Sequence, residues 1–318
     1  MVVYNENVMS SPVVAWWVFL CVIATVNIAA WSLAARNLGR RQAVMSVEAQ
    51  AACRIQIALS AVYVFGCAFR CVFPVYDIPR LGLFDTWLSS VAVGRSVATV
   101  AELCFVAQWA VVLHATATSA GSALARGVSL VLVPLIATAE ICSWYAVLTT
   151  SNLGHVAENS IWALAALLVI MGMMSILPQY AAPRRRLLFA WCLAGLAYVA
   201  FMFVFDVPTY WARHVADMAA NRHYLGIAQG LADVEQRRVI SYRWEDWQSE
   251  VVWMTLYFSI GVWFSISLTQ RLSSYTHMLT ADARFSDSMA PQPAMVNGLA
   301  SRAASRSRGR PRASLPNR

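Results

Sequence analysis

Long apolar runs, separated by short segments that contain arginine but no lysine, dominate this chain of 318 residues. A hydrocarbon core ~30 Å thick is crossed by a helix of about 20 mostly apolar residues. Only 13% of the residues are charged, about half the share usual in a soluble domain. The runs are too long for barrel strands, and they lack the alternation with period two that such strands show. The sequence therefore predicts an all-α integral membrane protein.

We expect a bundle of seven transmembrane helices. The predicted spans are 13–34, 56–73, 90–114, 127–149, 160–177, 187–205 and 251–269. The long loop 206–250, between the sixth and seventh spans, is too long for a simple connection. Its middle has a helical pattern, so we expect it to lie on the membrane surface or to cap the bundle. Residues 1–281 would form the transmembrane domain.

The arginines predict an orientation, because short cytoplasmic loops are enriched in basic residues. Arginines gather between spans one and two, between spans five and six, and after span seven, whereas acidic residues gather on the opposite side. We therefore expect the N-terminus outside and the C-terminus in the cytoplasm. Arginine in place of lysine also suggests a GC-rich genome, and we expect a bacterial inner (plasma) membrane.

The C-terminal segment 282–318 has a different composition, rich in Ser, Ala, Pro and Arg. Such a segment cannot bury a core, and we expect a disordered cytoplasmic tail that sets the topology and adds solubility. Its arginines would attract anionic lipid headgroups, at roughly 1 kcal/mol per basic residue near the surface. Nucleic acid binding is the competing reading, and we do not favour it.

Four charged residues fall inside the predicted spans: Arg70, Arg95, Glu102 and Glu140. Ionisable groups within a membrane are costly, and they normally face the bundle interior or a wet cavity. Two arginines and two glutamates can pair. This set therefore predicts either a ligand-binding pocket or a buried ion-pair network that locks spans two, three and four together.

Helical spacing adds polar and aromatic neighbours to these charges. Thr99 and Trp109 share the face of Arg95 and Glu102, because residues seven apart lie two turns along one side of a helix. Tyr63 lies on the face of Arg70 by the same spacing, and Trp144 follows Glu140 by one turn. We expect the aromatic side chains to line the walls of the pocket.

Two histidine–acid pairs outside the predicted spans are weak candidates for a metal site. His155 and Glu158 are three residues apart, as are His214 and Asp217. Side chains at this spacing share a helix face, and both can bind one metal ion. The same pattern is common by chance, and both pairs can be solvated helix ends.

Several cofactor chemistries are excluded or disfavoured. A retinal Schiff base and Ser–Lys catalysis both require a lysine, which this chain lacks. A transmembrane haem needs histidine ligands inside facing spans, whereas His114, at the edge of its span, is the one histidine within a predicted span. No cofactor is assigned.

Two functions remain. The first is a sensor or carrier that binds a small anionic molecule from outside through Arg70 and Arg95, with the glutamates holding the arginines or taking up protons. The second is a membrane-embedded enzyme that acts on a lipid or lipid-linked substrate at the outer leaflet, with Glu102 or Glu140 as general acid or base. Histidines that converge on the glutamates would favour the enzyme, and solvent-facing histidines would favour binding.

Overall fold

The computed structural model describes residues 11–42, 45–180, 182–237 and 239–270. Seven helices in this part of the chain are long and apolar enough to cross a membrane, which confirms the predicted helical membrane protein with seven candidate spans. The predicted tail at 282–318 and its lipid contacts lie outside the described residues.

The long helices extend beyond the predicted apolar runs. Three of them begin at a serine, Ser46, Ser90 or Ser122, whose hydroxyl accepts a hydrogen bond from the backbone N–H three residues later. Such a cap satisfies one of the free N–H groups of the first turn. A capped helix can therefore include polar turns that lie outside the apolar run. The first six long helices are α1 (Ser11–Gln42), α2 (Val47–Val72), α3 (Val91–Ser119), α4 (Ala123–Thr149), α5 (Asn152–Ile176) and α6 (Ala182–Phe201).

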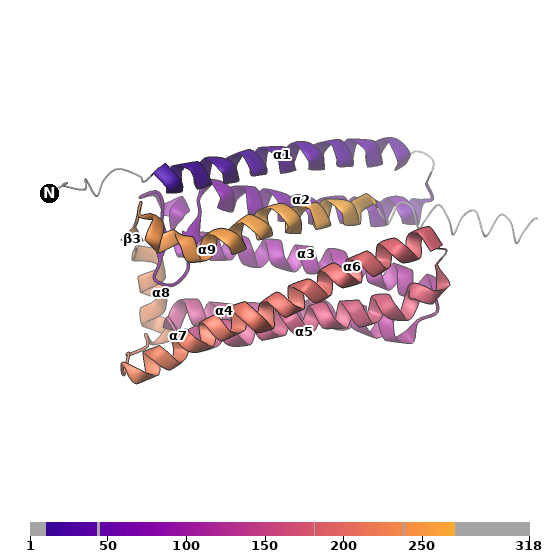
Figure 1. The fold of residues 1–318 in the computed structure, drawn as a ribbon. Coiled ribbons are helices and arrows are strands. Elements are labelled where there is room, and N and C mark those ends of the chain that lie inside the picture. Colours follow the sequence, from indigo (N-terminus) through magenta and orange to yellow (C-terminus); the bar gives the residue numbers. More distant parts are fainter. Residues whose placement is uncertain (1–10, 43–44, 181, 238, 271–318) are drawn as a thin grey trace, which may run out of the picture. The chain divides into compact units, whose positions relative to one another are not determined.

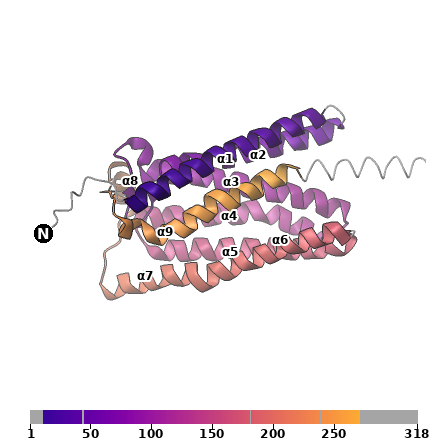
Figure 2. The same ribbon diagram turned by 45° about the horizontal axis from the view of Figure 1, so that its top comes forward.

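The seventh long helix begins as α9 (Trp244–Leu256) and continues through the π-helical segment η4 (Tyr257–Gly261) to Gln270. We refer to residues 244–270 as the last helix. Consecutive helices from α1 to α6 pack against one another, and the last helix returns to pack on α1 and α2 (Figures 1 and 2).

Large apolar side chains are exposed on the outer faces of the helices. Ile141 is 70% exposed, Leu130 66% and Val22 55%. Soluble proteins rarely expose contiguous apolar patches of this kind, whereas a helix in lipid gains by presenting them. The outer faces therefore fit contact with a hydrocarbon core.

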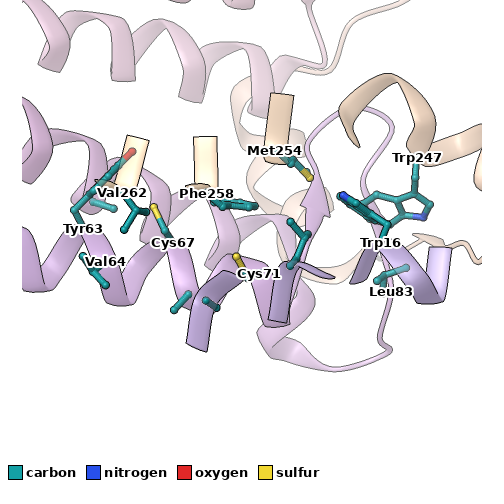
Figure 3. Packing of buried hydrophobic residues seen from close by; sticks show 14 of the residues in the cluster. Trp16, Tyr63, Val64, Cys67, Cys71, Leu83, Trp247, Met254, Phe258 and Val262 are labelled. Carbon is teal, nitrogen blue, oxygen red and sulfur yellow. The ribbon is translucent and has the colours of Figure 1, made fainter. Parts of the chain in front are cut away.

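One apolar cluster joins the last helix to α1 and α2. Trp16 of α1 and Trp247 of α9 pack with their ring centroids 5.6 Å apart, and Tyr63 and Phe258 extend the cluster along the helices (Figure 3). The fully buried Trp247 indole donates a hydrogen bond to the Ser241 carbonyl at 3.0 Å. This packing fixes one wall of the cavity described below.

The segment predicted as the loop 206–250 is largely helical. The sixth long helix does not end near residue 205, because α6 continues through the π-helical η3 (Met202–Asp206) into α7 (Val207–Ala219). A second short helix, α8 (Ile227–Gln236), follows. The helical pattern predicted for the middle of this segment is thus confirmed.

Helix α8 packs on the end of α4 and so caps that part of the bundle. A Cβ atom added at Gly230 would lie 2.0 Å from the Leu148 carbonyl oxygen, so only glycine allows this approach. Arg80 fastens the same end: it pairs with Asp233 of α8, and its Nη2 donates to the Val147 carbonyl at 2.9 Å.

A small sheet lies at this end of the bundle. Strand β1 (Val75–Tyr76) pairs antiparallel with β2 (Leu81–Gly82), and β2 pairs in parallel with β3 (Val239–Ile240). The sheet connects the segment between α2 and α3 to the segment before α9. Asp77 directly follows β1, so the sheet holds it near the bundle interior.

Candidate functional site

A cavity of about 620 Å³ lies among α2, α3, α5, α6 and the last helix. Charged side chains, including Arg95 and Glu158, line it near the end that carries the small sheet. Trp109 and Trp191 line it at the other end, about 20 Å farther along α3 at a rise of 1.5 Å per residue. The cavity is therefore polar at one end and aromatic and aliphatic at the other.

Arg95 is the centre of the polar end. Its Nη2 atom lies 2.7 Å from Glu140 Oε2 of α4 and 3.1 Å from Glu158 Oε1 of α5. The same atom lies 3.5 Å from Oε2 of Glu102, which follows Arg95 by two turns on the same face of α3. Arg95 Nη1 lies 3.9 Å from Asp77 Oδ2. One buried guanidinium thus binds three helices and the loop before α3 together.

A second row of side chains holds the glutamates in place. Thr99 donates its hydroxyl hydrogen to Glu140 Oε2 at 2.7 Å, and the Trp144 indole N–H donates to Thr99 Oγ1 at 3.1 Å. Tyr257 of the last helix donates to Glu102 Oε1 at 2.9 Å. Thr99 and Tyr257 thus restrain the two carboxylates directly, and Trp144 holds Thr99 in place.

His155 and Glu158, which we expected outside the spans, lie inside the bundle. Helix α5 begins at Asn152, eight residues before the predicted span, so that both side chains are buried. His155 Nδ1 and Glu158 Oε2 form a hydrogen bond of 2.8 Å. The imidazole also lies against the Tyr210 ring of α7, with the ring centroids 4.9 Å apart.

Arg70 does not join the charged cluster. It lines the same cavity, and its guanidinium carbon lies 5.7 Å from the centre of the Phe258 ring. No carboxylate of the described residues lies within 4.0 Å of it, and its buried Nε atom has no hydrogen-bond partner there. The expectation that two arginines and two glutamates pair with each other is wrong for Arg70. Arg95 is the arginine that contacts the carboxylates of the cluster.

The predicted metal-ligand pairs do not converge. Asp217 accepts hydrogen bonds from Asn152 and Arg222, and His214 contacts Tyr224, so neither joins His155 and Glu158. The carboxylates that do converge are Glu102, Glu140 and Glu158, whose oxygens lie within 4.8 Å of one another. Arg95 Nη2 already occupies the position between them, so a metal ion would have to displace a guanidinium.

Further polar groups surround the mouth of the cavity near the small sheet. Arg213 of α7 lies 3.9 Å from Glu250 of α9, with its guanidinium 5.9 Å from the Tyr76 ring. Burial, followed by the charge of Glu250, raises the pKa of Tyr76 to about 12, so this hydroxyl stays neutral. Asn159 donates to Asp206, which links α5 to η3. These contacts join α7 to the last helix and α5 to η3 at this end of the cavity.

Most of the predicted pocket residues lie in or beside this site. Tyr63, Arg70, Arg95, Glu102 and Trp109 line the cavity, as expected of a pocket. Three further predicted residues lie next to them: Glu140 contacts Arg95, Thr99 contacts Glu140, and Trp144 contacts Thr99.

Two residues that contact the charged cluster, Asp77 and Tyr257, were not predicted from the sequence. Asp77 follows a predicted span and looks like an ordinary loop acid, and Tyr257 lies in a span that contains no charge. No sequence signal identifies Asp77. Tyr257 is the one tyrosine within the predicted span 251–269, and a hydroxyl in an apolar span is a detectable sign of a buried hydrogen bond.

No protein-family model, curated protein or solved structure matches this chain. We therefore infer the function from the cavity and its residues.

Proposed function

We propose that this integral membrane protein binds a small amphipathic molecule with an anionic group inside the cavity, as a sensor or a carrier. The observation that carries the proposal is one cavity of about 620 Å³ with charged groups at one end and tryptophans at the other. Binding sites for small molecules are concave and mostly apolar, with a few placed polar groups. This cavity has that composition.

Arg70 is the group we assign to the anion. Arg95 is engaged by four carboxylates, so it offers little attraction to a further negative charge. Arg70 faces the cavity with a guanidinium that no described carboxylate neutralises. A carboxylate or phosphate on the ligand would form charge-assisted hydrogen bonds with it, while an apolar body would lie against Trp109 and Trp191.

We also propose that the polar end of the cavity faces the outside. Arg36, Arg40 and Arg41 lie in the last turns of α1, at the opposite end of the bundle, and basic residues are enriched at the cytoplasmic ends of spans. In this orientation the end of the cavity that holds Arg95 and Glu158 lies toward the outer leaflet. A bacterial inner membrane is the compartment we propose.

The test uses a fluorescent long-chain carboxylic acid as the probe, added to purified protein in detergent. Ala166→Trp fills the cavity that this alanine lines, and we expect at least a tenfold loss of probe affinity. Leu164→Trp places the same ring on the exposed face of α5, where Leu164 is 46% exposed, and is the matched control.

Arg70→Gln tests the assigned anion site. It should weaken binding of the acid and leave binding of a primary amine with the same chain unchanged. Equal affinity of wild type and Ala166→Trp for the acid would reject the cavity as the site. A loss in Ala166→Trp without a loss in Arg70→Gln would reject only the assigned anion site.

The second candidate is an enzyme that acts on a lipid or lipid-linked substrate at the outer leaflet. The observation in its favour is the buried His155–Glu158 hydrogen bond at the cavity wall, because a histidine oriented by a carboxylate is a common general base. Glu102 or Glu140 would then serve as the partner acid. Mass spectrometry of phospholipids incubated with the protein in liposomes tests it: conversion by wild type and none by His155→Gln supports an enzyme.

A further inference from the structure

Carboxylates outnumber cations around Arg95. Glu102, Glu140 and Glu158 are 7%, 3% and 6% exposed, and their oxygens lie within 4.8 Å of one another. Like charges this close repel strongly even at an effective dielectric constant of about 20. One guanidinium balances one of these three charges, and Asp77, 3.9 Å from Arg95, adds a fourth.

The other charged groups that face the cluster do not remove the surplus. His155 on α5 contacts Glu158, so a protonated imidazole would balance that carboxylate alone. Thr99 on α3 and Tyr257 on η4 are neutral donors. Arg70 on α2 has no carboxylate within 4.0 Å among the described residues. Even with both Arg95 and His155 positive, one of the three buried glutamates remains unbalanced.

The hydrogen bonds identify which glutamate this is. Glu140 accepts from Arg95 and Thr99, and Glu158 accepts from Arg95 and His155. Among the described residues, Glu102 accepts a hydrogen bond only from Tyr257, and Arg95 lies farther from it, at 3.5 Å. Of the three buried glutamates, Glu102 is therefore the one that the surroundings stabilise least.

A second observation points to the same place. Glu140 Oε1 is buried and has no hydrogen-bond donor within the described part of the chain. A buried acceptor without a donor has lost its hydration and gained no hydrogen bond in return, which is unfavourable. One oxygen of Glu102 lies within 4.8 Å of an oxygen of Glu140, so a carboxylic acid on Glu102 would supply the missing donor.

We infer that Glu102 and Glu140 together bind a proton: Glu102 carries it as a neutral carboxylic acid and donates it toward Glu140 Oε1. Glu102 lines the cavity and Glu140 does not, so the proton is reached from the cavity side. The site takes up or releases a proton when the charge in the cavity changes. An anion bound at Arg70 would strengthen the hold of Glu102 on this proton, and this last consequence alone rests on the proposed function.

Infrared difference spectroscopy of the full chain in detergent tests the inference without any ligand. A neutral carboxylic acid has a C=O stretching band separate from that of a carboxylate, and the band shifts in heavy water. We expect such a band at neutral pH in wild type, its loss in Glu102→Gln, and its retention in Glu245→Gln, which changes a largely exposed glutamate. A wild-type spectrum without the band, or a band that survives Glu102→Gln unchanged, overturns the proton site.

Thermal unfolding of matched variants gives a second, independent readout. Glutamine at 102 reproduces the neutral acid and can still donate to Glu140 Oε1, so Glu102→Gln should unfold at the same temperature as wild type. Glu140→Gln removes a charged partner of Arg95 and should unfold at a lower temperature. Equal destabilisation by both variants would mean that Glu102 is ionised, and would overturn the inference.

Discussion

At the scale of single residues, Arg95 decides how α3, α4 and α5 meet. Its guanidinium is 5% exposed and lies within 4.0 Å of carboxylates from all three helices. A buried charge pair adds little net stability compared with apolar packing, but removal of one partner leaves an uncompensated charge. Arg95 is therefore a residue whose loss the fold cannot compensate.

Replacement of Arg95 by glutamine should destabilise the protein by about 3–5 kcal/mol, the usual cost of breaking a buried ion pair. Chemical unfolding in detergent, followed by tryptophan fluorescence, measures it. Arg243→Gln is the control, because that side chain is 73% exposed and its ion pair with Glu245 contributes little. A stability of Arg95→Gln equal to that of wild type would show that the cluster does not depend on this charge.

At the scale of helices, a close approach of α4 and α5 brings Glu140 and Glu158 to the same arginine. A Cβ atom added at Gly154 would lie 2.6 Å from the Cys142 carbonyl oxygen and 2.7 Å from Ala146 Cβ. Small residues let helix backbones approach closely in membranes, where packing rather than the hydrophobic effect joins them.

Gly154→Ala should therefore push α5 away from α4 and lower the unfolding temperature, despite the higher helix propensity of alanine. Gly127→Ala in α4 is the matched control: nothing lies within 4 Å of its added Cβ, so it should keep or raise stability by up to about 1 kcal/mol. A Gly154→Ala protein as stable as the Gly127→Ala protein would contradict this close packing.

The sequence predicts helices better than it predicts their ends and contacts. Apolar length is a property of the chain alone, and it identifies each candidate span. Polar turns such as the one that holds His155 and Glu158 look like loop to a hydropathy pattern, although a tertiary partner, Arg95, makes their burial favourable. Helical spacing put Arg95 and Glu102 on one face, but which helices face them is set by packing between distant segments. Asp77 could not be found for that reason, whereas the hydroxyl of Tyr257 in an apolar span was a detectable signal.

At the scale of the whole molecule, the distribution of arginine predicts how the protein sits in the membrane. Cysteine labelling in intact cells with a membrane-impermeant maleimide tests it. Ala220→Cys, just after α7, should react from outside, and Ser119→Cys, at the far end of α3, should react only after permeabilisation. Both positions are exposed. The reverse pattern would invert the proposed orientation and place Arg70 toward the cytoplasm.

Native mass spectrometry of the protein released from detergent shows whether the cavity holds a small molecule. We expect wild type and Leu164→Trp to carry a bound species whose mass identifies its class, and Ala166→Trp to have lost it. The same bound species on Ala166→Trp as on wild type, at the same occupancy, would show that ligands lie elsewhere on the protein. Wild type without any bound species, after addition of the carboxylic acid probe, would contradict a ligand-binding function for this cavity.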